Sequence, residues 1–363
     1  MHLEPLPAPP VLVQLAPPGR GGVFDYLQCL KAEWEAQGVS SHVIALSREL
    51  AGQHSLAERI AECGMQASQP CALVLHFSGY GYAQRGLCFW LLAELHALRA
   101  VRAQRREGLR LVVVFHELFA SGPPWRSAFW LSRWQALIAA RLARMADALW
   151  TNTEQHARWL ARVVEPATPI RVRPVFSNVG EPGVSPATGG RQSTAVVFGS
   201  APTRQRVFDE LRGHEATLRR LGIEELIEVG NGPRSTGGPT TIPRRHVGRL
   251  EAPDLGRLLQ AARFGLLDYP SQFLGKSGVF AAYAAHGCVV LDTRRPGPDT
   301  DRLVMGGHYL SLPALAGAAD LPASREAIAA RLLGWYADHR LTDQARDLLA
   351  LATAAQPPAG AGP

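Results

Sequence analysis

Lysine is rare in this chain, and one of its two lysines lies in the turn Gly275-Lys276-Ser277-Gly278. The Lys276 ammonium is a compact point charge of the kind that binds phosphate, and the Ser277 hydroxyl is a hydrogen-bond donor. A small-residue helix that begins near Gly278 would add its unpaired backbone N–H groups. Because a cation at a helix start is unfavourable with the helix dipole, an anion-binding role explains Lys276 better than an exposed surface position does.

A second glycine-rich turn, Gly21-Gly22, follows the apolar segment 11–16 and precedes a helical pattern that ends at Gly38. Backbone N–H groups at that helix start favour an anion. The spacing matches neither the P-loop motif nor the dinucleotide-binding glycine motif. Gly21 and Gly22 are therefore candidate anion contacts, and a plain strand-to-helix turn explains them equally well.

The apolar segment 112–115 runs directly into His116 and Glu117. A histidine at the end of a strand can donate a hydrogen bond or act as a general base. A histidine bonded only to the neighbouring backbone is the alternative interpretation. No third ligand follows His116 and Glu117 at a suitable spacing, so no metal site is predicted.

Apolar segments and helical patterns alternate along the whole chain. This alternation predicts an α/β protein with parallel sheets and helices on both faces of each sheet. A stretch rich in Gly, Pro and Ser at 179–193 separates two such series. We therefore expect two Rossmann-like domains that face each other across a cleft, with ligands at the carboxyl ends of the strands.

The domain boundaries follow from these composition changes. The predicted division is an N-terminal domain over 1–178, a linker over 179–193, a C-terminal domain over 194–323, helices over 324–353 and a flexible tail over 354–363. The helices are expected to pack back toward the N-terminal domain.

The chain is basic, with 38 Lys and Arg against 31 Asp and Glu, a net charge of +7 and a pI near 9.5. Such a charge suits a polyanionic partner: nucleic acid, anionic lipid or a phosphorylated substrate. Five cysteines without a C-x-x-C pair predict neither a disulfide framework nor a zinc site, which fits a reduced, cytoplasmic protein. The sequence also predicts no signal peptide and no membrane-spanning helix.

The helical pattern at 125–149 is unusually rich in tryptophan and arginine. We assign one face to the core, with Trp134, Ile138, Leu142, Met145 and Leu149. Another face carries Arg126, Trp130, Arg133, Leu137, Arg141 and Arg144. This second face fits an anionic membrane surface, and a solvated arginine face with partly buried tryptophan explains it equally well. No nucleic-acid-binding module is recognisable, so nucleic acid is not a predicted partner.

Taken in their order along the chain, the motifs resemble those of GT-B glycosyltransferases, in particular the retaining, nucleotide-sugar-dependent enzymes of family 4. The N-terminal motifs are GRGGVFDYL, FHE and SNVGEP, and the C-terminal motifs are VVFGS, EVGNGP, HVGRL and LLDYPSQF. Each motif is weak alone. Their order carries the resemblance, which covers most of the chain.

Residues 270–290 align without a gap to the segment of that family that holds the donor sugar and the ribose. The family has two glutamates there, with seven residues between them, whereas this chain has Leu274 and Ala282. Lys276 and Ser277 remain as the polar groups of the turn. One interpretation is a divergent, active enzyme that holds its donor with Lys276 and Ser277. The other is a degenerate fold that binds without catalysing, and the retained polar glycine-rich motifs favour the first.

The resemblance implies a role for each candidate residue. It assigns the donor to Gly21, Gly22, Arg204 (with Arg206 as the nearby alternative), Asn231, Gly232, Lys276, Ser277 and Gly278. It assigns catalysis to His116 and Glu117, and the acceptor side to His76, Tyr80 and Tyr82. The family needs neither a metal nor another cofactor, because basic groups and helix termini neutralise the leaving diphosphate.

We therefore expect a cytoplasmic, metal-independent, retaining, hexosyltransferase-like enzyme. It would transfer a sugar from a nucleotide-diphosphate sugar to a saccharide or lipid-linked saccharide, in polysaccharide or glycoconjugate biosynthesis. The segment 125–149 adds peripheral contact with the anionic inner face of a membrane to this expectation. The alternative is a non-catalytic nucleotide- or carbohydrate-binding protein on a degenerate glycosyltransferase fold.

Overall fold

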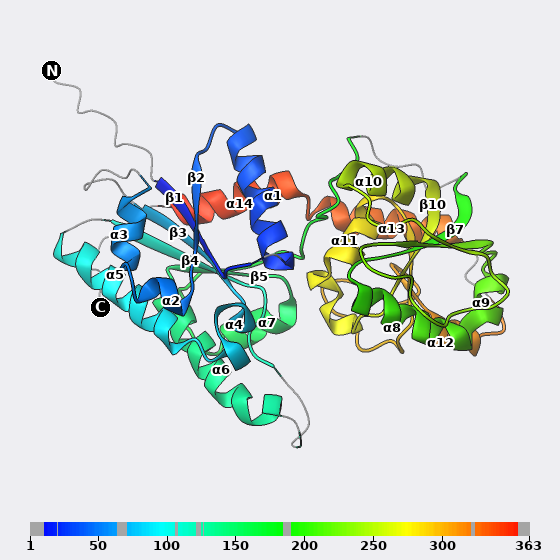
Figure 1. Ribbon diagram of the computed structural model, residues 1–363, viewed down its shortest axis with the longest axis horizontal. Coiled ribbons are helices and arrows are strands. Elements are labelled where there is room, and N and C mark those ends of the chain that lie inside the picture. Colours follow the sequence, from blue (N-terminus) through cyan, green and yellow to red (C-terminus); the bar gives the residue numbers. More distant parts are fainter. Residues whose placement is uncertain are drawn as a thin grey trace. The chain divides into compact units, whose positions relative to one another are not determined.

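The computed structural model describes residues 11–19, 21–63, 71–105, 108–120, 125, 127–183, 190–320 and 324–354. The chain forms two compact units, which Figure 1 shows coloured along the sequence. Unit 1 comprises Met1–Arg173 together with Thr342–Pro363, and unit 2 comprises Pro174–Leu341. None of the helices in the described ranges combines the length and the hydrophobicity that are needed to cross a membrane.

Unit 1 is built on a parallel six-stranded sheet in the order β2-β1-β3-β4-β5-β6. Its inner strands are nearly unbroken runs of apolar residues because helices cover both faces of the sheet (Figure 1). β1 lies between β2 and β3, so β1 and β3 form a topological switch point. The strands are β1 (Val11–Ala16), β2 (Ser41–Ala45), β3 (Cys71–Phe77), β4 (Leu109–Phe115), β5 (Ala148–Thr151) and β6 (Ile170–Val172).

The helices of unit 1 connect these strands, and the last one returns from the end of the chain. They are α1 (Gly22–Ala36), α2 (Arg48–Ala51), α3 (Leu56–Ala61), α4 (Gly79–Tyr82), α5 (Phe89–Gln104), α6 (Ser127–Met145), α7 (Glu154–Leu160) and α14 (Leu341–Thr353), with a short 3-10 turn η1 (Gln84–Gly86). The Trp34 Nε1 atom donates to the carbonyl oxygen of Ala345 over 2.8 Å. The Arg173 guanidinium pairs with the Asp347 carboxylate. α14 is therefore fastened to unit 1 beside α1.

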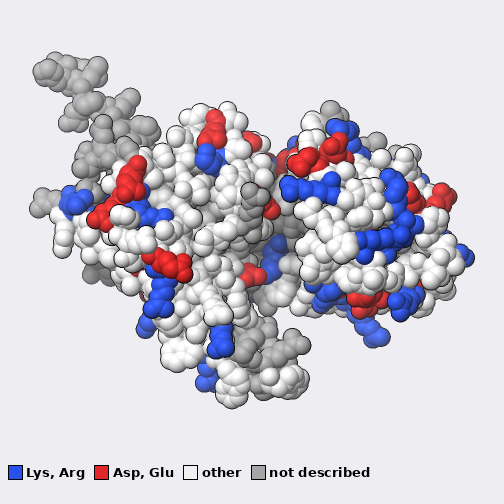
Figure 2. All heavy atoms as spheres, in the orientation of Figure 1, with Lys and Arg blue, Asp and Glu red and all other residues white. Residues whose placement is uncertain are grey.

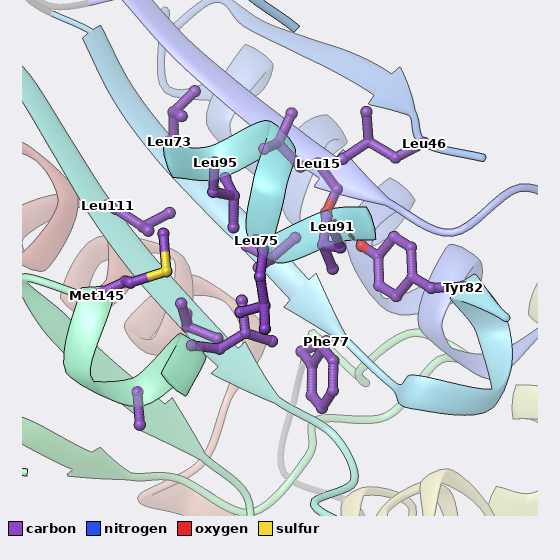
Figure 3. Packing of buried hydrophobic residues seen from close by; sticks show 14 of the residues in the cluster. Leu15, Leu46, Leu73, Leu75, Phe77, Tyr82, Leu91, Leu95, Leu111 and Met145 are labelled. Atoms are coloured by element: carbon purple, nitrogen blue, oxygen red, sulfur yellow. Dashed lines mark hydrogen bonds between the residues drawn. The ribbon is translucent and has the colours of Figure 1, made fainter. Parts of the chain in front are cut away.

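The core of unit 1 includes a cluster on the face of the sheet that α5 and α6 cover. Figure 3 shows Leu15 of β1, Leu75 and Phe77 of β3, and Leu91 of α5 within this cluster. All four side chains are fully buried, and each contributes about 1.5–3 kcal/mol to stability through burial. This packing fixes the carboxyl ends of β1 and β3, where several candidate residues lie.

Unit 2 has the strand order β12-β11-β10-β7-β8-β9, again with every neighbouring pair parallel. Strands are added in one direction from β7 to β9 and in the other from β10 to β12, so β7 and β10 form its switch point. The strands are β7 (Gln192–Phe198), β8 (Glu225–Val229), β9 (Arg244–His246), β10 (Ala262–Leu267), β11 (Val289–Asp292) and β12 (Leu310–Ser311). The helices are α8 (Ala201–Leu211), α9 (Glu215–Arg220), α10 (Ala252–Ala261), α11 (Gly278–Ala285), α12 (Leu312–Ala316) and α13 (Arg325–Ala337), with 3-10 turns η2 (Arg212–His214) and η3 (Ser271–Lys276).

The predicted α/β class with two Rossmann-like domains is confirmed, while the division of the chain differs in detail. The chain enters unit 2 at Pro174 and returns to unit 1 at Thr342. The predicted C-terminal helices are thus divided, because α13 belongs to unit 2 and α14 to unit 1. Within the predicted linker, Val179 is buried and β7 already begins at Gln192. Residues 184–189 of that linker and 355–363 of the predicted tail lie outside the described residues.

The prediction for 125–149 needs correction at two positions. α6 ends at Met145, and Leu149 belongs to β5. Trp134, which we assigned to the core, is 54% exposed. Trp134 lies at the edge of the helical stripe that carries the exposed Trp130 and Arg133, on the part of α6 that begins away from the sheet in Figure 1. Ile138, Leu142 and Met145, farther along α6, are buried as predicted, and Arg126 lies outside the described residues.

Candidate functional site

A cavity of about 200 Å³ opens at the switch point of unit 2, where β7 and β10 end. Parallel α/β sheets bind ligands at this position because the connecting helices diverge there. The lining groups include three donor residues that the sequence predicted in one turn, Lys276, Ser277 and Gly278, and a fourth from α8, Arg206. The cavity therefore combines residues that lie about seventy positions apart in the sequence.

Two cations, the Asp268 carboxylate and a helix start give this cavity its charge. The Lys276 ammonium lies 5.1 Å from the centre of the Phe273 ring, and the Nε atom of Arg206 lies 3.3 Å from the Asp268 Oδ2 atom. Ser277 caps α11: its hydroxyl accepts a hydrogen bond from the Phe280 N–H over 3.2 Å. The cap uses the Ser277 hydroxyl as an acceptor, and a hydroxyl can donate a hydrogen bond as well. This set of groups suits an anion.

Two aspartates that were not among the predicted site residues follow or end strands here, and one of them, Asp268, lines the cavity. Asp268 follows β10 and pairs with the guanidinium groups of both Arg206 and Arg294. Asp292 ends β11 and is fully buried. Burial raises the pKa of Asp292 to about 7, although backbone N–H groups of Arg294 and Tyr269 partly oppose this and the Asp268 charge adds to it. The signal was present in the sequence, since both aspartates terminate apolar strand patterns.

A larger cavity of about 530 Å³ lies beside the first, at the ends of β7 and β8. Asn231 and Gly232, which the resemblance assigned to the nucleotide, line it. The rest of the lining is mostly apolar and includes Leu250 and Leu255, and Arg249 adds one cation. A flat, mostly apolar ligand with a few polar atoms fits such a surface.

The prediction that Arg204 contacts a diphosphate is corrected by its surroundings. Its side chain is fully buried, and its nitrogens donate to the Glu228 carboxylate and to the carbonyl oxygens of Gly199, Asn231 and Pro233, at 2.6 to 3.2 Å. Arg204 thus ties the loops after β7 and β8 to each other. Arg206, the nearby alternative, is the half-exposed cation that reaches the cavity.

The loop after β8 requires its first glycine. Gly230 has a φ of +148°, and a Cβ atom there would lie 2.2 Å from Arg204 Nη1 and 2.3 Å from the Gly199 carbonyl oxygen. Below it, the buried Glu228 carboxylate binds Arg204, Arg244 and Ser235. Burial alone would raise the pKa of Glu228, but these hydrogen bonds outweigh it and lower the pKa to about 2. Glu228 is therefore ionised and organises the wall of the larger cavity.

In unit 1, Gly21 and Gly22 lie where β1 meets α1, at the switch point with β3. Gly21 is the N-cap of the 15-residue helix α1, and Gly22 is its first residue. A Cβ atom at either position would meet nothing within 4 Å. Packing against the described residues therefore does not require glycine at Gly21 or Gly22.

A hydrogen-bonded row of three side chains crosses β1, β3 and β4. The Oε1 atom of Gln14 lies 3.0 Å from His76 Nε2, and His76 Nδ1 lies 3.2 Å from His116 Nε2. A carboxamide oxygen only accepts, so His76 carries its proton on Nε2 and accepts at Nδ1 from His116. Burial, and then the nearby His116, hold the pKa of His76 well below its usual value, so the His76 ring is neutral.

These contacts correct the acceptor-side assignment. His76 is fully buried, so it acts on His116 rather than on a ligand. Tyr82 is also buried, and its hydroxyl lies 2.9 Å from the carbonyl oxygen of His76, to which it donates. Tyr80 is exposed and accepts a hydrogen bond from the Gln135 side chain. Of the three predicted residues, only Tyr80 presents its ring to solvent.

The two catalytic candidates lie next to each other but have different partners. The His116 backbone N–H bonds to the Phe77 carbonyl oxygen, while its ring bonds to His76 and packs edge-on against Tyr26. The Glu117 carboxylate accepts a hydrogen bond from the Ser78 hydroxyl over 3.0 Å. In the described part of the chain, no three His, Cys, Asp or Glu side chains gather as a metal site would require.

Comparison with known proteins gives a fold and no sequence family. No family model matches the sequence, and no curated protein sequence matches it. Among solved structures, the apo form of OtsA superposes with a TM-score of 0.56 at 12% identity, covering 96% of this chain and all of that one. An alpha-glucosyltransferase (AGT) in complex with UDP superposes with a TM-score of 0.54 at 10% identity, covering 94% of this chain and all of that one.

A further structure of an alpha-glucosyltransferase, with UDP-glucose and DNA containing an abasic site, also gives a TM-score of 0.54. It is 10% identical to this chain and covers 94% of it. These neighbours are GT-B glycosyltransferases, and this chain, with its two parallel six-stranded sheets, superposes on them over nearly its whole length. The chain therefore has the GT-B fold.

Proposed function

We propose that this chain is a nucleotide-sugar-dependent glycosyltransferase whose donor site lies in unit 2. One observation carries the proposal: two cations and the start of α11 meet in a cavity at the β7/β10 switch point. The larger cavity beside it, lined by Asn231 and Gly232, has the size and the apolar lining for a nucleoside. The proposal is supported by the GT-B fold and by the UDP and UDP-glucose in two of the structural neighbours.

In this proposal the diphosphate binds Lys276, Arg206 and the backbone N–H groups at the start of α11. These groups neutralise the charge that develops on the leaving nucleoside diphosphate, so the transfer needs no metal and no further cofactor. Fixed charges of this kind stabilise a transition state without reorganising when the bond breaks, and losing one costs about 3–4 kcal/mol in well-studied cases.

The resemblance to family 4 extends the proposal to the reaction. Leu274 and Ala282, at the positions of the family's glutamates, are fully buried. We propose that Lys276 and Ser277 replace those carboxylates as donor contacts. His116 and Glu117 of unit 1 are the proposed catalytic groups, with Tyr80 on the acceptor side and Gly21 and Gly22 near the diphosphate.

The proposed reaction retains the configuration of the transferred sugar. Its proposed acceptor is a saccharide or lipid-linked saccharide in polysaccharide or glycoconjugate biosynthesis. The proposed location is the cytoplasm, with peripheral contact with the inner face of a membrane.

The first experiment measures binding of UDP, GDP, ADP and TDP to the full chain by calorimetry, followed by hydrolysis of the matching nucleotide sugars. Lys276→Ala is expected to lower the affinity for the nucleoside diphosphate about tenfold or more, because a charge-assisted contact to phosphate is lost. Lys31→Ala is the matched control, since Lys31 is the other lysine of the chain and lies on α1 in a pair with Glu35. If none of the four nucleotides binds, the donor site is wrong.

The second candidate function is nucleotide or carbohydrate binding without catalysis. The replacement of both family glutamates by Leu274 and Ala282 favours it. It predicts that a nucleoside diphosphate binds with an affinity that depends on Lys276, while no nucleotide sugar in the panel is hydrolysed or transferred. Slow release of free sugar from one donor supports the transferase instead.

A further inference from the structure

The exposed aromatic side chains of this protein are concentrated in one region of unit 1. Of the eight large apolar side chains that are exposed among the described residues, six are aromatic and belong to α4, α5, α6 or the turn before α6. We call these six the aromatic surface: Tyr80, Phe89, Trp125, Phe129, Trp130 and Trp134. Three of them are tryptophans with 83%, 68% and 54% of their surface exposed, in chain order. Exposed groups of this kind mark interaction sites.

Contacts between the elements hold several of these rings in place. The Phe89 ring meets the Trp134 ring edge-on at 6.3 Å, and Phe129 meets Trp130 at 5.3 Å. Gln135 of α6 is buried and donates to the Tyr80 hydroxyl over 3.2 Å, which joins α4 to α6. Because contacts among α4, α5 and α6 hold Tyr80, Phe89 and Trp134, this part of the aromatic surface is preformed.

The same Gln135 fastens an arginine at the edge of the aromatic surface. Its Nε2 atom donates to the Arg85 carbonyl oxygen over 2.7 Å. Arg85 is exposed and has a φ of +61°, a conformation that is uncommon for a residue other than glycine. The bond from Gln135 helps to hold the backbone in this conformation.

The charged side chains of α6, beside these rings, are all positive. α6 contains no Asp or Glu, and its exposed arginines, Arg133, Arg141 and Arg144, lie on the same helical stripe as Trp130 and Trp134. On the face that Figure 2 shows, the described atoms around the start of α6, next to the grey ones, are white and blue without red.

We propose that the aromatic surface docks on an anionic lipid bilayer. Tryptophan and tyrosine prefer the headgroup level of a bilayer, where the ring is apolar and its N–H or O–H group stays hydrated. Arginines beside them attract the negative surface potential of anionic lipids. α6 then lies along the membrane surface with its aromatic stripe in the interface and its buried stripe on the sheet of unit 1.

A second copy of the chain fits the aromatic surface less well. A twofold contact through this surface would bring each arginine stripe against its own copy, with no carboxylate on α6 to balance the charge. Lipid headgroups supply the missing negative charge. The inference deepens the proposed function, since it places the peripheral contact on named side chains, but the docking itself does not require the donor site.

The test uses the full chain and sedimentation with vesicles of phosphatidylcholine, alone or with 30% phosphatidylglycerol. We expect about tenfold or stronger partitioning to the anionic vesicles at 50 mM salt and a marked loss at 500 mM salt. The double variant Trp130→Ser/Trp134→Ser is expected to lose about tenfold in partitioning, and so is Arg133→Gln/Arg141→Gln. Brominated lipid should quench the tryptophan fluorescence of the wild type more than that of the tryptophan variant.

Matched controls separate docking from folding and from the donor site. Leu50→Ser removes an exposed apolar side chain from α2, and Arg219→Gln removes an exposed arginine from α9; neither should change partitioning. Nucleoside diphosphate binding should stay the same in both double variants, which shows that the donor site of unit 2 is intact, and an unchanged urea unfolding transition of the full chain shows that unit 1 is folded. The proposal is overturned if the tryptophan double variant partitions to anionic vesicles as strongly as the wild type does. A lack of vesicle binding also overturns it, whether a dimer or salt-dependent binding to single-stranded DNA takes its place.

Discussion

The Nδ1 atom of His76 lies 3.2 Å from the Nε2 atom of His116, and the opposite side of the His76 ring is held by Gln14. The row fixes the positions of both protons, because the Gln14 oxygen can only accept. A neutral His116 consequently carries its proton on Nε2 and its lone pair on Nδ1. His76 is thus a positioning residue for His116. The hydrogen bonds of the row select the tautomer with the proton on Nε2 in both rings.

Removing the His76 acceptor should impair the proposed reaction without removing the donor site. We expect His76→Leu to lower kcat about 10- to 100-fold, because the His116 ring loses a buried hydrogen-bond partner, while the donor KM changes less than threefold. His76→Asn places an amide oxygen near the former Nδ1 atom and should recover part of the rate. Steady-state kinetics from pH 5.5 to 9 measure both. Equal rates and equal pH profiles in the wild type and His76→Leu would contradict the positioning role.

Two arginines on one helix should behave in opposite ways. Arg204→Ala leaves the buried Glu228 with one charged partner fewer and removes the tie between two loops, so it should destabilise unit 2 by about 3–5 kcal/mol. Arg206→Ala removes a half-exposed side chain, so it should cost less than about 1 kcal/mol and weaken nucleoside diphosphate binding about tenfold. Urea unfolding and calorimetry separate the two effects. An Arg204→Ala protein that is as stable as the wild type but no longer binds the nucleoside diphosphate would instead support Arg204 as a diphosphate contact.

Glu228 should be the carboxylate of β8 on which stability depends most. Glu228→Gln leaves the buried guanidinium groups of Arg204 and Arg244 without their counter-charge, at an expected cost of about 3–5 kcal/mol. Glu225→Gln, on the same strand, breaks an exposed pair with Arg245 and should cost less than about 1 kcal/mol. Equal unfolding midpoints for the two variants at pH 7 would contradict the stabilising role of the contacts between Glu228 and the two arginines.

The low pKa of Glu228 also gives a pH dependence with a definite sign. Its pKa is about 2 in the folded protein and 4.5 ordinarily. The stabilisation is therefore complete above pH 4.5 and is lost as the pH falls toward 2. Urea unfolding of the wild type and of Glu228→Gln should converge as the pH is lowered through this window.

Asp292 should show the opposite pH dependence. Burial first, and the Asp268 charge in addition, raise its pKa to about 7 from an ordinary 3.8. The contribution of Asp292 to the free energy of unfolding is therefore fully present below pH 3.8, where the carboxyl is protonated, and is lost as the pH rises through 7. Asp292→Asn keeps an oxygen for the N–H groups of Tyr269 and Arg294 and removes the buried charge. The variant should be more stable than the wild type by about 1–3 kcal/mol at pH 8 and similar to it at pH 4, as thermal unfolding at the two pH values can show.

The sequence predicted where polar groups gather because strand ends are readable. Apolar runs that stop at Ala16, Phe115, Val229 and Leu267 mark the carboxyl edges of parallel strands, and the structure places a cavity at two such edges of unit 2. The turn around Lys276 was predicted from residue type alone, and it does line a cavity. Local chemistry was sufficient in these cases because each feature depends on neighbours in the chain.

The same reasoning failed where partners come from distant segments. Arg204 and Arg206 have the same side chain two positions apart, and only the carboxylate of Glu228 and three carbonyl oxygens decide that Arg204 is buried. Trp134 was assigned to the core by its spacing from Ile138 and Leu142, but it lies at the edge of the exposed stripe that carries Trp130 and Arg133.

By itself, the sequence determined the α/β class, the two Rossmann-like series and the edges at which polar groups collect, since these follow from local periodicity. Which polar and aromatic groups stay accessible was decided by tertiary structure. His76 looked like a ligand contact until Gln14 and His116 enclosed it. The physical reason is that burial depends on what packs opposite a side chain, and that partner is set by the register of strands distant in the sequence.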